Sequence, residues 1–468
     1  MKKLSLLFCM LLTCTILRAQ LRLPAFISSG MVLQQQDSVR LWGWASPGQD
    51  VSVTTGWDGQ IVRTKTSSFA FWEVKVKTPA AGGPYDIQIT THETLKLSDV
   101  MIGEVWLCSG QSNMEWSFNH GEKDIAAELS LPANGNIRFF HVPKTGSAHL
   151  QDDVKGQWTI AGPETLKSFS AVAYFFGKRL QKQLNVPIGL VNASWGGTPA
   201  EAWTPAALVN EDPELRAAAA ALEANPGWPT VPGAAYNAMI APLTKANIAG
   251  VIWYQGESNV KTYGSYEKLF TSMIDAWRKA WTKPFPFYYV QIAPHTYENK
   301  FQGALLQEAQ TRSMAHARTG MVVTTDLIDS AANIHPSHKK PVGERLAAWA
   351  LGDHYNVPGI TYRNPQVTNV QVLKSKIRIS VGNAGSGLRA SGRDAAGFML
   401  GDETGNWFPA VARVSKNSIE VTSAQLSQPK YVRYGFSNTR PGNIQTKEGL
   451  PLIPFRSDTQ VIVEEKEQ

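Results

Sequence analysis

The sequence predicts an α/β protein in which a central parallel sheet, covered by helices on both faces, stands between N-terminal and C-terminal β-sandwich or jelly-roll segments. Three observations predict this fold: apolar and polar residues alternate in 20–99, strand and helix patterns alternate in 100–357, and strand patterns return in 358–468. Regular alternation of strands with helices is typical of a parallel sheet covered on both faces. A chain of 468 residues, 43% of them hydrophobic, is long enough to bury the cores of such domains.

Residues 1–19 are predicted to form a signal peptide. A positively charged start precedes the apolar run 4–17, which is too short to be a comfortable membrane span, and cleavage is expected near Ala19. The mature protein is therefore expected to be exported, either periplasmic or secreted. Lipoprotein anchoring through Cys14 is less favoured, because Thr13 occupies a position where a smaller residue is usual.

Cysteine content and net charge argue against a disulfide-stabilised fold and against a nucleic-acid-binding protein. After the leader, Cys108 is the only cysteine, so an intramolecular disulfide is not expected. The formal charge of +7 becomes +4 when Lys2, Lys3 and Arg18 are removed with the leader, and no basic block remains for a nucleic-acid partner. No later apolar run is long enough for a membrane span. Nothing in the pattern fixes an oligomeric state.

The N-terminal β domain is assigned to residues 20–99. Its expected strands, separated by Gly and Pro turn signals, are 39–44, 51–53, 72–76 and 85–89.

The central domain is assigned to residues 100–357. Its expected strands are 99–107, 188–191, 248–254, 287–292 and 321–325, and its expected helices are 168–184, 215–224, 266–281, 305–317 and 341–351.

The C-terminal β region is assigned to residues 358–468. Its expected strands are 367–372, 376–381, 398–400, 419–421 and 431–436.

Ser112 is the strongest candidate nucleophile, because it follows a predicted buried strand on a tight turn. Such a turn exposes the hydroxyl and aims backbone N–H groups at a developing oxyanion. A plain turn or helix cap is the alternative for an isolated Gly-x-Ser triplet. The second glycine of a Gly-x-Ser-x-Gly elbow is absent, which argues against an α/β-hydrolase elbow.

Two more polar stretches follow predicted strands. Paired glycines at Gly196 and Gly197 allow close backbone approach, so one of their N–H groups is a candidate oxyanion donor, with a simple strand-to-helix turn as the alternative. Asn259, in the stretch 255–259, is a candidate amide donor or a helix cap, and Glu257 is a candidate for orienting its neighbours. Ligands of open α/β sheets bind beyond the carboxyl ends of such strands.

His335 supplies a candidate general base in a fourth polar stretch after a strand. His338 lies three residues later, but Pro336 breaks helical spacing and no third ligand cluster appears, so neither a metal nor another cofactor is expected.

The chain order Ser112, glycine pair, Asn259, His335 resembles that of the SGNH hydrolases, and more narrowly the sequence resembles the sialate O-acetylesterase family. The shared phrases are MVLQ at 31–34, GGPY at 82–85, SGQSNMEW at 109–116, WGGT at 195–198, YNAMIAPL at 236–243, WYQGESN at 253–259, IHP at 334–336 and RYGFSN at 433–438. They span nearly the whole mature chain. The resemblance implies a central SGNH-hydrolase sheet.

The resemblance also implies roles for individual residues. Ser112 is expected to be the nucleophile and His335 its general base, with the Ser112 N–H, Gly196 or Gly197 and Asn259 forming the oxyanion hole. The superfamily usually carries Asp three residues before its histidine, where this chain has Ala332.

The group that orients His335 is therefore left open. Asp329 is the preferred candidate, Asp326 is an alternative, and a backbone carbonyl that leaves a Ser–His dyad is a third.

Five residues near these motifs are candidates for contacting substrate, since aromatic faces cover the C–H side of a pyranose and polar groups orient it. They are Gln111, Trp116, Trp203, Gln255 and Glu257.

The expected function is removal of O-acetyl groups from carbohydrate by a serine esterase that needs no cofactor, with an O-acetylated sugar or glycan as partner. Sialate O-acetylesterase activity is preferred, and acetylxylan or plant-glycan acetylesterase activity is the alternative. A carbohydrate-binding protein with a weak or inactive esterase site is the alternative of another class. A lipase-type hydrolase, which would cleave long-chain esters in preference to acetyl esters, is a third.

Overall fold

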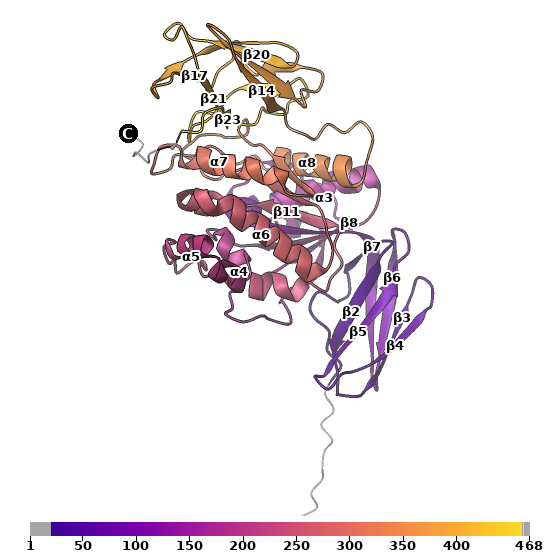
Figure 1. Cartoon of the computed structure of the whole chain (residues 1–468). Helices are drawn as coiled ribbons and strands as arrows, with labels where there is room; N and C mark the ends of the chain where they lie inside the picture. The colour runs from indigo at the N-terminus through magenta and orange to yellow at the C-terminus, as the bar shows by residue number, and fades with distance from the viewer. Residues whose placement is uncertain (1–19, 461, 463–468) are drawn as a thin grey trace, which may run out of the picture.

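The computed structural model describes residues 20–460 and 462 and has three parts in a row (Figure 1). A β domain near the N-terminus leads into a central α/β layer structure, and a second β region lies beyond helices α7 and α8. The expected fold class is confirmed. The predicted signal peptide lies outside the described residues.

The central sheet has the strand order β13-β12-β11-β7-β10-β8-β9. All neighbouring pairs are parallel except β8 and β9, which are antiparallel. The strands are β7 (Thr94–Gly110), β8 (Asn134–His141), β9 (Trp158–Ala161), β10 (Ile188–Ser194), β11 (Gly250–Tyr254), β12 (Phe287–Val290) and β13 (Thr319–Val322). Strands β8 and β9 were not predicted, and the strand expected at 99–107 is part of the longer β7.

Helices cover both faces of this sheet. Alternate residues of β11 point to opposite sides, so Val251 and Trp253 belong to one apolar cluster while Ile252 and Tyr254 belong to another. The first cluster includes residues of α6 and α7, and the second includes residues of α3 and α8. The helices are α1 (Ser112–Glu115), α2 (Pro163–Leu166), α3 (Ala171–Leu184), α4 (Ala206–Glu211), α5 (Pro213–Ala220), α6 (Tyr263–Trp281), α7 (Gln302–Arg312) and α8 (Lys340–Trp349).

Strand β7 belongs to two parts of the molecule. Its first half pairs with β6 and β1 of the N-terminal domain, and its second half pairs with β10 and β11. The strand ends at Gly110, which has φ +137°, and a Cβ there would lie 2.2 Å from the Tyr254 carbonyl oxygen. A glycine is therefore required where the chain passes close to β11 and turns toward Ser112.

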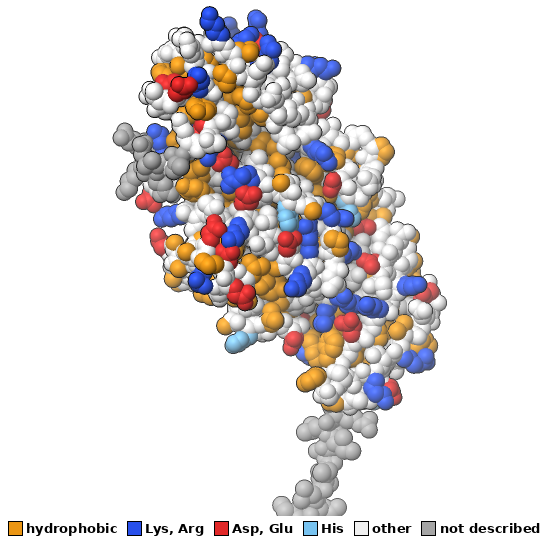
Figure 2. Space-filling view, viewed as in Figure 1, with side chains coloured by type: hydrophobic (Ala, Val, Ile, Leu, Met, Phe, Trp, Pro, Cys, Tyr) orange, Lys and Arg blue, Asp and Glu red, His pale blue; other side chains and the backbone are white. Residues whose placement is uncertain are grey.

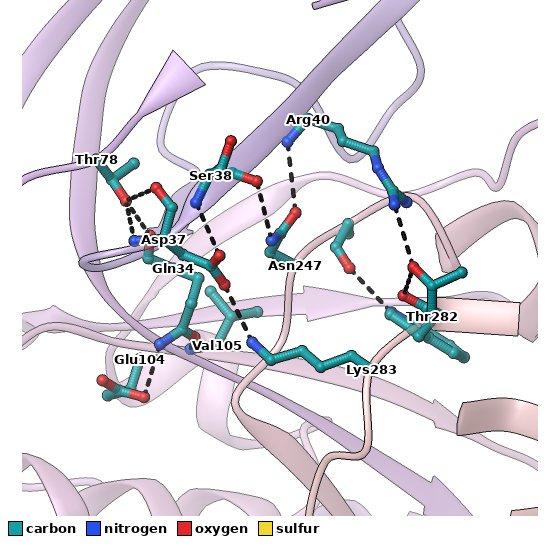
Figure 3. Close-up of polar contacts among 12 residues, drawn as sticks. Gln34, Asp37, Ser38, Arg40, Thr78, Glu104, Val105, Asn247, Thr282 and Lys283 are labelled. Atoms are coloured by element: carbon teal, nitrogen blue, oxygen red, sulfur yellow. Dashed lines mark hydrogen bonds and ion pairs between the residues drawn. The ribbon is translucent and has the colours of Figure 1, made fainter. Parts of the chain in front are cut away.

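The N-terminal domain contains the four expected strands and two more, at 32–34 and 61–65. These strands are β1 (Val32–Gln34), β2 (Ser38–Trp44), β3 (Asp50–Thr55), β4 (Ile61–Lys65), β5 (Phe71–Lys77) and β6 (Gly82–Thr90). Figure 3 shows its polar contacts with the central domain, in which Asp37 pairs with Lys283 at 3.0 Å and Asn247 donates to the Ser38 carbonyl at 3.3 Å.

The C-terminal region is all β, as predicted. Its strands are β14 (Gln366–Val372), β15 (Ile377–Gly382), β16 (Leu388–Ala390), β17 (Phe398–Gly401), β18 (Trp407–Pro409), β19 (Val411–Val414), β20 (Ser418–Thr422), β21 (Tyr431–Tyr434), β22 (Ile444–Thr446) and β23 (Phe455–Arg456). Arg456 holds it to α7 by two hydrogen bonds to Glu308, of 2.8 and 3.0 Å.

The surface seen in Figure 2 carries Lys and Arg interspersed with Asp and Glu over the central part, without a block of one sign. Within residues 20–460 and 462, no helix combines the length and apolar character of a membrane span.

Candidate active site

The four polar stretches meet at one edge of the central sheet. Strands β7, β10 and β11 end side by side, at Gly110, Ser194 and Tyr254, because their registers are parallel. Chain reversals after these ends bring Ser112, Gly196 and the loop after Tyr254 together. This edge is where open α/β sheets bind ligands.

Ser112 and His335 are in direct contact. The imidazole Nε2 of His335 lies 2.8 Å from Ser112 Oγ, although 223 positions separate the two residues in the chain. Ser112 is the first residue of α1, so its own N–H has no acceptor within the helix. Both side chains are partly exposed. The arrangement joins a nucleophile to a base that a substrate is able to reach.

The surroundings of His335 keep it neutral. Burial is the main cause that lowers its pKa to about 4, and the positive charge of Lys339 adds to the effect. The ring stacks on Trp116 with centroids 4.0 Å apart and planes 18° apart. Its backbone N–H donates to Asn333 Oδ1 at 3.0 Å. A neutral imidazole is the form that accepts a proton from the serine hydroxyl.

Neither aspartate that was expected to orient His335 contacts it. Asp329 accepts hydrogen bonds from the N–H and hydroxyl of Ser337, at 2.9 and 2.6 Å, and Asp326 forms an ion pair with Arg345. Among the residues that the structure describes, no carboxylate lies within ion-pair distance of His335. The Asp329 and Asp326 predictions are therefore wrong as to direct contact, and the geometry is that of a dyad.

The glycine pair lies beside Ser112, but only one of its two N–H groups already donates a hydrogen bond within the protein. The Gly196 N–H donates to Glu115 Oε2 at 2.7 Å, so it is already engaged. The Gly197 N–H has no acceptor among residues 20–460 and 462. Gly197 has φ +80°, and a Cβ there would lie 2.2 Å from the Trp228 ring. The positive φ angle and the closeness of the Trp228 ring therefore both require a glycine at position 197.

Asn259 does not face the nucleophile, which corrects the oxyanion-hole prediction. Its amide nitrogen donates to Glu201 Oε2 at 2.9 Å and Thr262 Oγ1 at 3.2 Å, and its oxygen accepts from the Ala200 N–H and Gln255. The residue is fully buried. Asn259 therefore fixes the segment after the glycine pair against the loop after β11.

Two proposed substrate contacts are also wrong. Trp203 is fully buried, and its indole N–H donates to Thr198 Oγ1 at 2.8 Å. Gln255 is fully buried as well, with its amide nitrogen 2.8 Å from Asn259 Oδ1. Neither side chain reaches the surface of the site.

The three other candidates for contacting substrate differ in how far their side chains are exposed to solvent. Gln111 is buried, and its side-chain oxygen accepts from the N–H groups of Gly256 and Ser258, at 3.2 and 3.4 Å. Glu257 is buried behind the site. Trp116 is partly exposed and remains a candidate for contacting substrate.

Sequence reasoning missed several residues of the site. Asn113 donates to Glu257 Oε1 at 2.6 Å and accepts from Lys339 Nζ at 2.5 Å. Glu115 lies beside Ser112 and pairs with Lys144. Asn113 and Glu115 belong to the SGQSNMEW phrase, which was the available signal, whereas nothing in the sequence marked Lys339.

His338, the second histidine of the IHP region, lies 3.0 Å from an Asp124 carboxylate oxygen and 3.8 Å from one of Asp329. Within the described part of the chain, no group of three or more His, Cys, Asp or Glu side chains is placed to hold a metal ion.

Comparison with known proteins places this chain among carbohydrate esterases. The family described as carbohydrate esterase, sialic acid-specific acetylesterase, matches residues 102–351. Sialate O-acetylesterases of Pongo abelii and Homo sapiens are each 31% identical over 404 residues, covering 76% of this chain and 75% of theirs. A crystal structure of a carbohydrate acetylesterase from Xanthomonas citri is 32% identical with a TM-score of 0.85, covering 94% of this chain and 100% of that one.

Proposed function

Because the chain belongs to the family of sialic acid-specific carbohydrate acetylesterases, we propose that Ser112 and His335 act as a catalytic dyad that hydrolyses acetyl esters on sugars. The protein is a carboxylic ester hydrolase of the carbohydrate esterase class. The observation that supports the dyad is the 2.8 Å contact between Ser112 Oγ and His335 Nε2.

The reaction follows from this geometry. Ser112 Oγ attacks the acetyl carbonyl carbon while His335 Nε2 takes the hydroxyl proton, and a tetrahedral intermediate forms. The imidazolium then protonates the departing sugar oxygen, which leaves an acetylated serine. A water molecule, deprotonated by the same imidazole, attacks that ester, and the imidazolium returns the proton to Ser112 Oγ as acetic acid leaves and ionises to acetate. The site returns to its starting state.

Backbone groups are proposed to stabilise the oxyanion. The Ser112 N–H lies at the start of α1, and the Gly197 N–H is free of other acceptors among the described residues. Removing one such donor typically costs about 3 kcal/mol of transition-state stabilisation. Gly196 is a weaker candidate, because Glu115 Oε2 already accepts its hydrogen at 2.7 Å.

Two aromatic rings, one stacked on His335 and one beside Gly197, are proposed to contact the sugar. Trp116 and Trp228 are both partly exposed, and Trp228 covers Gly197. An aromatic face packs well against the C–H side of a pyranose. We propose O-acetylated sialic acid as substrate, with acetylated xylo-oligosaccharide as the comparison.

Acetate release from 9-O-acetyl sialic acid and from an acetylated xylo-oligosaccharide tests the substrate. Faster release from the sialic acid supports the proposal. Faster release from the xylo-oligosaccharide would identify an acetylated plant glycan as the substrate instead. Binding to a glycan array without acetate release from either substrate would support the carbohydrate-binding alternative instead.

We also propose that the mature protein is exported, on the ground of the leader pattern in residues 1–19. Fractionation of cells expressing the full chain tests this, with N-terminal sequencing of the product. A product that begins near Gln20 in the exported fraction is expected. A cytoplasmic product that retains Met1 would contradict export.

A further inference from the structure

A buried polar cluster behind the dyad connects the two reacting residues. Asn113 donates to Glu257 Oε1 at 2.6 Å and to the Ile334 carbonyl at 3.0 Å, and its oxygen accepts from Lys339 Nζ at 2.5 Å. Asn113 and Lys339 are fully buried, and Glu257 is 6% exposed. Both amide hydrogens, and one lone pair of the amide oxygen, are thus directed to partners inside the protein.

The position of Asn113 in the chain gives this cluster its significance. Asn113 directly follows Ser112, and Ile334 directly precedes His335. The hydrogen bond between Asn113 and the Ile334 carbonyl therefore joins the backbone that carries the nucleophile to the backbone that carries the base. A shift at this bond changes the distance between Ser112 Oγ and His335 Nε2.

Opposite charges hold the amide in one orientation below about pH 7, the value to which burial lowers the pKa of Lys339. The ammonium of Lys339 lies on the oxygen side of Asn113, and the carboxylate of Glu257 lies on the nitrogen side. A rotation of the amide by half a turn would place the NH₂ group against the ammonium. The ammonium also lies over the Tyr254 ring, 5.4 Å from its centroid. Each buried charge stabilises the other, because either one alone would be uncompensated.

We propose that Asn113, held by Lys339 and Glu257, is a positioning residue that aligns His335 with Ser112 in place of the aspartate of a Ser–His–Asp triad. In such triads a carboxylate fixes the imidazole by direct contact. Here the alignment acts through the backbone before His335, and the stacked Trp116 ring restrains the imidazole plane. This inference rests on the proposed function of the dyad.

Lys339 also has an electrostatic effect on the base. The charged groups that face His335 are Lys339, His295 and His120, whose positive charges lower its pKa, and Glu115, whose negative charge raises it. Replacing Lys339 with an uncharged residue removes the largest of the lowering charges. The pKa of His335 then rises, and the acidic limb of the rate profile moves to higher pH. Looser packing around His335 would raise this pKa as well, because burial is the main cause of its low value, so the limb is compared only where the variant melts at the native temperature.

The test measures how fast a fluorophosphonate probe labels Ser112 between pH 3.5 and 8. This probe reports the nucleophile and its base without a sugar, so the result is independent of substrate choice. Native protein, Lys339→Met and Lys340→Met are compared, with thermal melting as a check on folding. Lys340 is the matched control, since it is the next residue and its side chain is exposed.

We expect Lys339→Met to label about tenfold to a hundredfold more slowly at the plateau, because misplacement of a catalytic group by about 1 Å has effects of that size. Its acidic limb should move to higher pH, while Lys340→Met should match the native protein. Glu257→Gln, which keeps the shape and the hydrogen-bond acceptor, provides a second test if Lys339→Met does not fold. It should lower the plateau and leave the limb unchanged.

The outcomes separate this inference from the proposed function. A folded native protein that the probe does not label overturns the dyad, and the positioning role with it. A labelled native protein whose folded Lys339→Met or Glu257→Gln variant keeps the native plateau overturns the positioning role alone, wherever the acidic limb lies.

Discussion

The pH dependence of ester hydrolysis follows from the environment of His335. Only the neutral imidazole accepts the Ser112 proton, so kcat/KM falls when His335 becomes protonated. With the pKa at about 4, about 97% of the imidazole is neutral at pH 5.5, whereas a histidine with the ordinary value of about 6.5 would be about 9% neutral. We therefore expect nearly full kcat/KM at pH 5.5 and a tenfold loss per pH unit below about 4.

Acetate release at subsaturating substrate, measured between pH 3.5 and 8, checks this expectation. Folding must be followed in the same buffers, because a histidine whose pKa is lowered in the native state binds more protons when unfolded. Its contribution to stability therefore decreases as the pH falls from about 6.5 toward 4. Circular dichroism at each pH separates this loss from protonation of the base. A folded protein with an acidic midpoint near 6.5 would refute the reasoning.

Three substitutions test the other assignments. Asp329→Asn should lower kcat by less than about tenfold, since Asp329 does not contact His335. A loss near the 10⁴-fold that is typical of a triad aspartate would show instead that Asp329 acts as the acid of a triad. Trp116→Leu should lower kcat by about twofold to tenfold, because the stacked ring contributes about 0.5–1.5 kcal/mol; an effect on KM alone would make Trp116 only a sugar contact. Asn259→Ala should lower the free energy of unfolding by about 1–3 kcal/mol, because it leaves Glu201 unpaired; unchanged stability in urea would contradict this role.

Local pattern was sufficient for much of the fold. The strands of the central sheet next to the site were predicted within a few residues, because buried parallel strands are continuous apolar runs bounded by polar loops. The continuity of β7 was not predicted, because its first part, TLKLSD at 94–99, alternates polar and apolar residues, whereas its second part is largely apolar and buried. Strands β8 and β9 were missed as well.

The sequence also identified which loops form the site, but not the direction of every side chain within them. Ser112 and His335 come together as expected, while Asn259 turns inward to Glu201, which lies 58 positions earlier. Sequence position fixes where a polar residue stands relative to a strand end, and a partner far along the chain decides which way it points. Trp203 and Gln255 also turn inward to distant residues: the Trp203 ring packs on Trp253, and the Gln255 amide donates to the Thr198 carbonyl 57 positions earlier.

Lys339 illustrates the remaining limit. Its ammonium contacts Asn113, which lies 226 positions earlier, and no local pattern distinguishes it from the exposed Lys340 beside it. Burial of a lysine among carboxylates is a property of the folded chain. Only the structure shows that this charge lies behind the dyad.

The most direct test is the rate of acetate release from 9-O-acetyl sialic acid by folded Ser112→Ala compared with the native protein. The substitution removes the nucleophile and leaves the surrounding hydrogen bonds of α1 intact. The native protein should release acetate at a readily measured rate, and the variant should release it about 10⁴-fold or more slowly. Release by Ser112→Ala at a rate close to native would contradict the serine mechanism.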